Sequence, residues 1–298
     1  MPDERIPVMK IPFQLIEEVI INLLRMAVTT LPRDVIDALE AALRREGNPT
    51  AKTQLEAILA NIRLAEETGT PMCQDTGVPL IFIKGHYEEG IEEAVRRGVE
   101  RATSAVPLRP NAVHPITRQN SGTNVGDGIP YIRWRPTMDE MVEITVMPKG
   151  AGSENMSRSI MLPPSDGVRG IKRFVLDAVV EAGGKPCPPT IVGLGIGGTS
   201  DVAPILAKEA LLVPLNEENP DPLLRSLEAE LFEALNSTGI GPMGLGGDTT
   251  VLGVRARAAY CHTASLPVAV NLQCWAARKA FARIYPDGMV TYSREGFE

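Results

Sequence analysis

The chain has 298 residues, with 44% hydrophobic and 22% charged, so it can bury a large core as one domain or two. Its 30 basic and 37 acidic residues give a net charge of −7, which argues against non-specific nucleic-acid binding. No stretch reaches the ~18 consecutive apolar residues of a membrane span, and the charged start MPDERIPVMK lacks the apolar region of a secretory signal, so we expect a cytoplasmic protein that binds no membrane.

The first part of the chain, residues 1–69, predicts a helical segment packed on the rest. Three helices are expected, over residues 13–29, 33–47 and 49–67. Asn48 is a good N-cap residue and Pro49 suits the first helical position, while Gly69 fits the position just after a helix end. Cys73 would then emerge on a loop directly after the third helix.

The rest of the chain, residues 70–298, alternates between strand-like and helical patterns. Strands are expected over 78–85, 129–136, 140–148, 190–198, 249–260 and 266–272, and helices over 88–103, 165–184, 200–212, 223–236 and from near Cys274. We expect strands 129–136 and 140–148 to pair with each other. The predicted fold class is α/β, with a helical N-terminal layer followed by a mixed α/β core that forms one integrated domain.

Four cysteines occur, and three of them lie in turn-rich segments: PMCQDTG around Cys73, KPCPPT around Cys187 and NLQCWAARK around Cys274. Their wide spacing matches neither a disulfide framework nor a CxxC zinc pattern. A single cysteine is more often a small buried hydrophobe, and we assign that structural role to Cys261. Three thiols that converge from distant loops instead suit a cubane iron–sulfur cluster, whose fourth iron would stay open as a Lewis acid.

Polar residues beside these cysteines are candidates for substrate contacts. Gln74 and Asp75 follow Cys73 directly, although DTG is also ordinary turn chemistry. The segment HPITRQNSGTN places Arg118 in a polar loop, where a guanidinium suits a carboxylate; a solvated turn is the alternative. His262 lies 12 residues before Cys274, and a lone histidine is as often structural as catalytic.

Three glycine-rich segments raise a nucleotide-binding alternative. The segment MPKGAGSENMS lacks the GxxxxGK[ST] order of a phosphate loop. The run GLGIGG at 193–198 loosely matches a dinucleotide fingerprint, but no acidic residue is clearly placed for a ribose. The third cluster, in GIGPMGLGGD, lets backbone pass close to a ligand. A nucleotide-binding site is therefore a weaker hypothesis than a metal centre.

Taken together, the segments MCQDTG, HPITRQNSGTN, PKGAGSENMS, CPPTIVGLGIGGTSD, GIGPMGLGGDTTVLGV and CHTASLPVAVNLQCWAARK resemble the α subunit of two-subunit class I fumarate hydratase and its relative L(+)-tartrate dehydratase. The resemblance spans about residues 70–280. It implies that Cys73, Cys187 and Cys274 hold a [4Fe–4S] cluster. It further implies catalytic and substrate-binding roles, which fall on Asp75, His262, Gln74, Arg118, and Gly150 or Gly152.

The resemblance favours the fumarate branch, because Arg118 and the GSEN segment look like fumarate hydratase and the tartrate relatives differ in both loops. It also implies a β subunit, since longer single-chain members carry a C-terminal domain that this chain, ending at Glu298, does not contain. We expect an α₂β₂ assembly that interconverts fumarate and (S)-malate, with the base supplied by the β subunit. The alternatives are L(+)-tartrate dehydration and a non-catalytic iron–sulfur or zinc protein.

Overall fold

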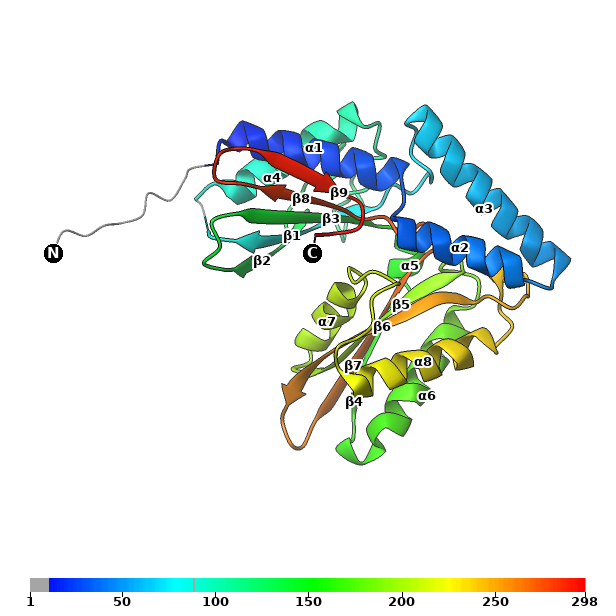
Figure 1. Ribbon diagram of the computed structural model, residues 1–298. Coiled ribbons are helices and arrows are strands. Elements are labelled where there is room, and N and C mark those ends of the chain that lie inside the picture. The colour runs from blue at the N-terminus through cyan, green and yellow to red at the C-terminus, as the bar shows by residue number, and fades with distance from the viewer. Residues whose placement is uncertain (1–10, 88, 298) are drawn as a thin grey trace. The chain divides into compact units, whose positions relative to one another are not determined.

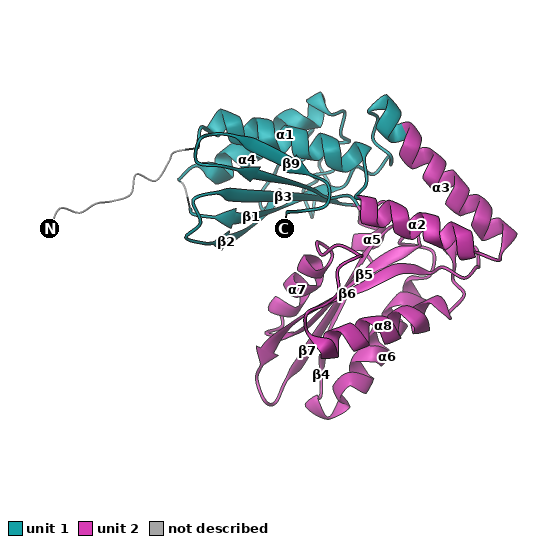
Figure 2. Ribbon diagram, in the orientation of Figure 1, with its two compact units in different colours: residues 1–32, 65–149, 278–298 teal, residues 33–64, 150–277 magenta. Residues whose placement is uncertain are grey.

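The computed structural model describes residues 11–87 and 89–297, which form two compact units (Figures 1 and 2). Unit 1 contains residues 1–32, 65–149 and 278–298, and unit 2 contains residues 33–64 and 150–277. The charged segment 1–10 considered above lies outside the described residues. The predicted N-terminal helices are all present, as α1 (Phe13–Thr29), α2 (Arg33–Arg45) and α3 (Pro49–Thr68). They contribute to both units.

Unit 1 is built on a five-stranded sheet in the order β2-β1-β3-β8-β9. Its strands are β1 (Val78–Gly85), β2 (Tyr131–Pro136), β3 (Val142–Lys149), β8 (Ala280–Ile284) and β9 (Val290–Ser293). The prediction that β2 and β3 pair with each other is wrong: β1 lies between them, parallel to β2 and antiparallel to β3. Strand β1 is apolar on both faces, which suits the more buried position between two neighbours.

One face of this sheet carries the core of unit 1. Alternate residues of β1 and β3, such as Ile81, Ile83 and Ile144, are at most 1% exposed and pack with the apolar stripes of α1 and α4 (Ile91–Ala105). The two helices approach closely at Gly98, where a Cβ would lie 2.8 Å from the Cβ of Ile20. Figure 1 shows α1 and α4 covering the same sheet.

Unit 2 is built on a four-stranded sheet in the order β4-β7-β5-β6. Its strands are β4 (Arg158–Leu162), β5 (Thr190–Gly198), β6 (Val251–Cys261) and β7 (Leu266–Gln273). Its helices beyond α2 and α3 are α5 (Ala151–Glu154), α6 (Gly167–Ala182), α7 (Val202–Ala210) and α8 (Pro222–Asn236), with 3₁₀ turns at Pro164–Asp166 and Pro242–Gly244. Alternate residues of the central strands, among them Val192 and Val270, pack against α6 and α8.

The short helix α7 packs on the opposite face of the second sheet. A Cβ on Gly195 would lie 2.0 Å from the carbonyl oxygen of Ala203, and one on Gly193 would lie 2.1 Å from that of Ala207. The glycines of β5 therefore serve close packing of a helix backbone on a strand. The chain uses this run for packing rather than as the phosphate-binding turn of a dinucleotide site.

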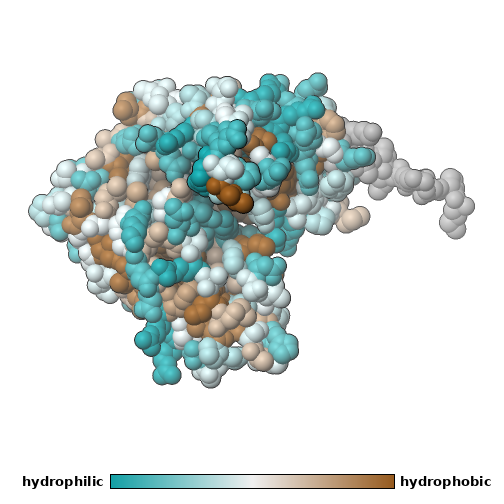
Figure 3. Space-filling model, turned by 180° about the vertical axis from the view of Figure 1, so that it is seen from behind, coloured by the Kyte–Doolittle hydropathy of each residue, from teal (hydrophilic) through white to brown (hydrophobic). Residues whose placement is uncertain are grey.

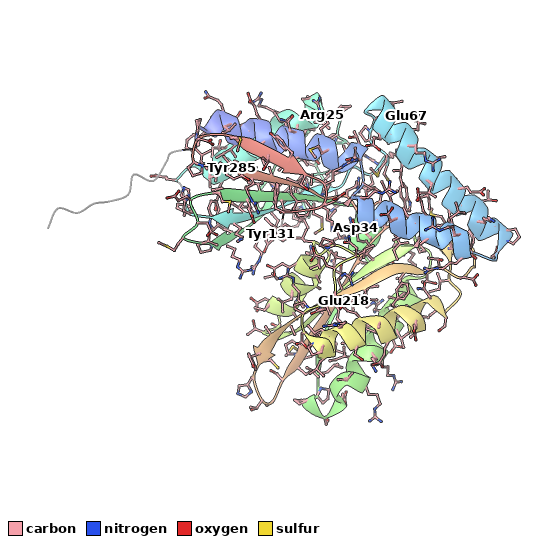
Figure 4. The ribbon with its side chains drawn as sticks, in the orientation of Figure 1. Arg25, Asp34, Glu67, Tyr131, Glu218 and Tyr285 are labelled. Carbon is pink, nitrogen blue, oxygen red and sulfur yellow. The ribbon has the colours of Figure 1, made fainter. Side chains whose placement is uncertain are left out.

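Helix α2 is fixed to unit 2 by polar side chains at both ends. The carboxylate of Asp34, labelled in Figure 4, accepts a hydrogen bond from the backbone amide of Leu215 at 2.6 Å. At the other end, Glu46 accepts from the amide of Asp248, whose carboxylate accepts from the amide of Gly47. The Asn48 side chain caps α3 as predicted, accepting from the amide of Thr50 at 2.9 Å.

The predicted helix near Cys274 is absent from the structure. Residues 274–279 form an irregular segment, and the chain then enters β8, which pairs with β3 from Ala280 to Ile284. The sequence ARKAFARI has good helix formers, but pairing with an apolar strand outweighs this propensity. Hydrophobic groups on the face in Figure 3 are interspersed with hydrophilic ones. No helix in the described part of the chain is long and apolar enough to cross a membrane.

Candidate active site

The loop that carries Cys73 is held in place by main-chain contacts within unit 1. The amide of Met72 donates to the carbonyl of Val28 at 2.9 Å, at the end of α1. Asp75 then closes a turn by accepting from the amide of Gly77 at 3.0 Å. Gly77 has φ +83°, and a Cβ there would lie 2.8 Å from the backbone nitrogen of Lys149. The half-buried thiol of Cys73 therefore sits on a short, well-anchored loop.

A buried arginine supports the same loop from the other end of the chain. Arg278 is 1% exposed, and its Nη1 donates to the carbonyl oxygen of Asp75 at 2.7 Å. Its Nε has no partner among the described residues. A guanidinium buried in this way requires acceptors, because unpaired buried charge is costly. Arg278 is thus a positioning residue for Asp75 that the sequence analysis did not find.

The polar loop 109–124 lies beside the Cys73 loop, also within unit 1. The Asn111 side chain donates to the carbonyl of Gly77 at 3.1 Å, and the amide of Arg109 donates to the hydroxyl of Thr76 at 3.0 Å. At the tip of this loop Arg118 adopts a left-handed backbone conformation, with φ +61°, and its side chain is exposed. The structure thus joins the segments that carry Gln74, Asp75 and Arg118.

Cys187 and Cys274 lie on adjoining segments at one end of the second sheet. Strand β5 begins three residues after Cys187, and β7 ends one residue before Cys274, with Gln273 opposite Ile191 in the antiparallel pair. The backbone amide of Trp275 donates to the carbonyl of Cys187 at 3.2 Å. Cys187 has φ +56°, a strained conformation for a residue with a side chain and one that clusters at functional sites.

The glycine-rich segment 150–153 approaches the Cys187 loop within unit 2. A Cβ on Gly152 would lie 3.3 Å from the carbonyl oxygen of Lys185, two residues before Cys187. Gly150 precedes α5, and the Ser153 hydroxyl donates back to its carbonyl at 3.2 Å. The structure therefore brings Gly150 and Gly152 to the same end of unit 2 as the two cysteines.

Gln273 is the most unusual buried side chain at this end of unit 2. It is 2% exposed, yet neither its Oε1 nor its Nε2 has a partner in the described part of the chain. An unpaired buried amide costs ~1–3 kcal/mol, so a group from outside the chain is expected to satisfy it. The only hint in the sequence was a polar residue that ends an apolar strand beside a cysteine.

His262 lies at the far end of β7 from these residues. It occupies the exposed turn between β6 and β7, where its Nδ1 accepts from the amide of Ala264 at 3.1 Å. Strand β7 has eight residues, so its ends are roughly 24 Å apart at about 3.4 Å per residue. The structure does not bring His262 to Cys274. Cys261, the last residue of β6, is also exposed, so the expectation that it is a buried structural residue is wrong; its thiol donates to the carbonyl oxygen of Ser265.

The described cysteines form no disulfides, and each unit alone holds at most two of the predicted metal ligands. Cys73 belongs to unit 1, whereas Cys187 and Cys274 belong to unit 2. Across residues 11–87 and 89–297, no cluster of three or more His, Cys, Asp or Glu side chains forms a metal-binding group. The assignment of the three thiols to one centre therefore stays a prediction.

Comparison with known proteins identifies relatives along nearly the whole chain. The sequence model of the family described as fumarate hydratase (Fumerase) matches residues 17–283. A Methanocaldococcus jannaschii protein named "Putative L(+)-tartrate dehydratase subunit alpha" is 52% identical over 280 residues, which cover 91% of this chain and 98% of that protein. The L(+)-tartrate dehydratase subunit alpha of Escherichia coli strain K12 is 34% identical over 276 residues, covering 91% of each chain.

Proposed function

This chain belongs to the fumarate hydratase family, and we propose that it is the α subunit of a two-subunit hydro-lyase that interconverts fumarate and (S)-malate with a [4Fe–4S] cluster. The observation that carries the proposal is the meeting of the Cys187 and Cys274 segments at one end of the second sheet. The loop of Cys73, in unit 1, carries the polar residues that suit a hydroxy-diacid substrate.

The residues fit such a cluster in two respects. None of the three thiols forms a disulfide within the described part of the chain, and all are half-buried, which suits soft ligands. Gln273, next to Cys274 in the sequence, presents an amide with no partner among the described residues, and cluster sulfurs accept hydrogen bonds.

When bound, the cluster supplies a Lewis-acidic iron that polarises substrate oxygens. The loop residues would perform the rest of the chemistry on the α-subunit side. In the direction from malate, the departing hydroxyl must take up a proton, and Asp75 is proposed as the acid that donates it. Its carboxylate is oriented by the amide of Gly77 and its main chain by Arg278. Gln74, exposed on the same loop, would hold a substrate oxygen by a hydrogen bond.

Substrate carboxylates would be held by Arg118 and by backbone groups of the glycine segment. Arg118 is exposed at the tip of a loop that hydrogen bonds anchor to the Asp75 loop, so its guanidinium can form a paired contact with a carboxylate. Gly150 and Gly152 would admit substrate close to the main chain. His262 lies at the opposite end of β7 from Cys274, so we assign it no contact with a substrate bound at the cluster of the same chain.

We propose that a β subunit completes the site and supplies the base that removes the proton next to the substrate carboxylate. The relatives named above are α subunits, which supports a two-subunit enzyme. L(+)-tartrate is the second candidate substrate, because both relatives carry the name of tartrate dehydratase. Malate and tartrate are both four-carbon hydroxy-diacids, so one site chemistry serves either.

The decisive experiment is an anaerobic assay of the full chain, reconstituted with iron and sulfide, with and without its β subunit. We expect turnover of malate and fumarate to exceed that of L(+)-tartrate, and to need the β subunit. A preference for tartrate would move the assignment to the second candidate. Full activity of the chain alone would contradict the partner proposal, and zinc in place of iron would contradict the cluster.

A further inference from the structure

Gln273 differs in its hydrogen bonding from Asn271, the other polar side chain of β7. It is the last residue of β7, it precedes Cys274, and it pairs in the ladder with Ile191, four residues after Cys187. The segment that follows Gln273 also meets the segment of Cys187, because the backbone amide of Trp275 donates to the carbonyl oxygen of Cys187. The backbone of Gln273 is therefore close in the chain or in the sheet to the segments of both cysteines of unit 2.

The comparison with Asn271, two residues earlier on the same face of β7, is informative. The Asn271 Nδ2 donates to Glu154 at 3.0 Å and to Ser157 at 2.7 Å, so this amide serves the fold. Its Oδ1 has no partner in the part of the chain that the structure describes, but Asn271 lines a cavity of about 280 Å³, which has room for water. Gln273 is not among the residues that line this cavity, and neither its Oε1 nor its Nε2 has a partner among the described residues.

From this geometry, and resting on the proposed function, we propose that Gln273 is a positioning residue for the cluster: its Nε2 donates a hydrogen bond to a cluster sulfide or a ligand thiolate. Amide donors near cluster sulfurs stabilise the reduced, more negative state, and they help retain the metal. The donor belongs to a rigid strand end, so it is held ready before the cluster binds. In the metal-free chain, the unpaired amide of Gln273 lowers the stability of the folded state.

The test substitutes Gln273→Met, which keeps length and volume but removes the donor and the acceptor. The matched control is Leu272→Met, a volume-conserving change at the neighbouring residue on the opposite, apolar face of β7. The full chain is prepared without metal and after anaerobic reconstitution. Three quantities are measured: the thermal midpoint without metal, the rate of cluster loss in air, and the midpoint potential of the cluster followed by its EPR signal.

We expect opposite signs in the two states. Without metal, Q273M should melt at the same or a higher temperature than the unsubstituted chain, because an unpaired amide has been removed. With the cluster, Q273M should lose it three- to tenfold faster in air and show a lower midpoint potential, whereas L272M should match the unsubstituted chain. Q273E, which keeps the shape but adds negative charge, should lower the potential at least as far.

Two results would overturn the inference. A Q273M cluster with unchanged potential and decay rate would show that the amide does not contact it. A Q273M chain that melts lower without metal, with an unchanged cluster, would assign Gln273 to the fold. Failure of the proposed function is separable, since it would appear as an unsubstituted chain that assembles no [4Fe–4S] cluster at all.

Discussion

The two units solve the packing of helices on a sheet in different ways. In unit 1, large aliphatic side chains such as Ile81, Ile83 and Ile144 fill the space between the sheet and α1 and α4. In unit 2, aliphatic side chains also fill the space between one face of the sheet and α6 and α8. On the other face, the backbone of α7 packs directly on the backbone of β5 at Gly193 and Gly195. Glycine thus marks where the second sheet must admit a close neighbour.

The units also differ in which buried polar atoms they leave without partners. Among the described residues, unit 2 has two residues with such atoms near its proposed ligands: Gln273 adjoins Cys274, and Thr190 begins the strand that follows Cys187. In unit 1, the comparable atom near Cys73 is the Nε of Arg278. Such atoms near the proposed ligands are candidates for hydrogen bonds to groups from outside the chain.

The largest expected effect tests whether the two units share one metal centre. Cys187→Ser or Cys274→Ser in unit 2 and Cys73→Ser in unit 1 should each lower bound iron by more than ~10-fold after reconstitution, because a ligand is lost. Iron analysis and the visible absorption of the cluster measure this loss. Cys261→Ser is the matched control and should retain both. If Cys73→Ser kept a full cluster, unit 1 would supply no ligand.

A smaller effect should separate the two kinds of helix packing. In Gly195→Ala the new Cβ meets the carbonyl of Ala203, so strand and helix backbones must part, at a cost of about 3 kcal/mol. In Gly98→Ala the Cβ would lie 2.8 Å from the Cβ of Ile20 and 3.0 Å from the carbonyl oxygen of Glu17, a milder clash than the 2.0 Å approach at Gly195, and the gain in helix propensity of about 1 kcal/mol offsets part of the cost. Urea unfolding midpoints should therefore fall much further for G195A. Equal losses would refute the contrast between the units.

The smallest expected effect concerns the surface of unit 2, where Lys172 on α6 forms an ion pair with Glu230 on α8. The hydrogen bond from Lys172 is the main cause that lowers the pKa of the Glu230 carboxyl below its usual range. Because the pKa of Glu230 is lower in the folded than in the unfolded state, the ion pair stabilises the folded state at pH values above the ordinary glutamate pKa. This stabilisation disappears as the pH falls through the folded-state pKa.

Glu230→Gln should therefore lower the thermal midpoint slightly near neutral pH and leave it unchanged once Glu230 is protonated. The measurement is the difference in melting temperature between the two proteins, followed from pH 7 down to about pH 3. Because both side chains are partly exposed, high salt should shrink the difference. A difference that grows on acidification would contradict the direction of the pKa shift.

Local sequence patterns predicted the elements well and their partners poorly. The Asn48 cap and the apolar spacing of residues 13–29 are local features, so α1 and α3 were placed to within a residue or so. The pairing of β2 with β3 was wrong because β1, which comes much earlier in the chain, lies between them. The prediction of a helix near Cys274 was wrong because of another distant contact: residues 280–284 pair with β3, which comes much earlier in the chain.

For the candidate site, chemistry-bearing residues in turn-rich segments could be found from the sequence, whereas supporting residues could not. Cys73, Asp75 and Cys187 stand in short motifs whose composition already indicates loops. Arg278 and Gln273 are distinguished only by their burial, at 1% and 2% exposed, and burial is set by the fold rather than by neighbours in sequence. The contact of Arg278 with Asp75 spans 203 positions, which no local pattern encodes.

The order of strands in the first sheet has a consequence for how this protein is made. Thr145 on β3 pairs with Phe281 on β8, 136 positions later, so during vectorial synthesis this edge of β3 stays unpaired until β8 has left the ribosome. Residues 150–277, the larger segment of unit 2, emerge in that interval. Nascent chains therefore carry an open strand edge, the kind of surface on which chaperones act and through which stalled or truncated chains associate.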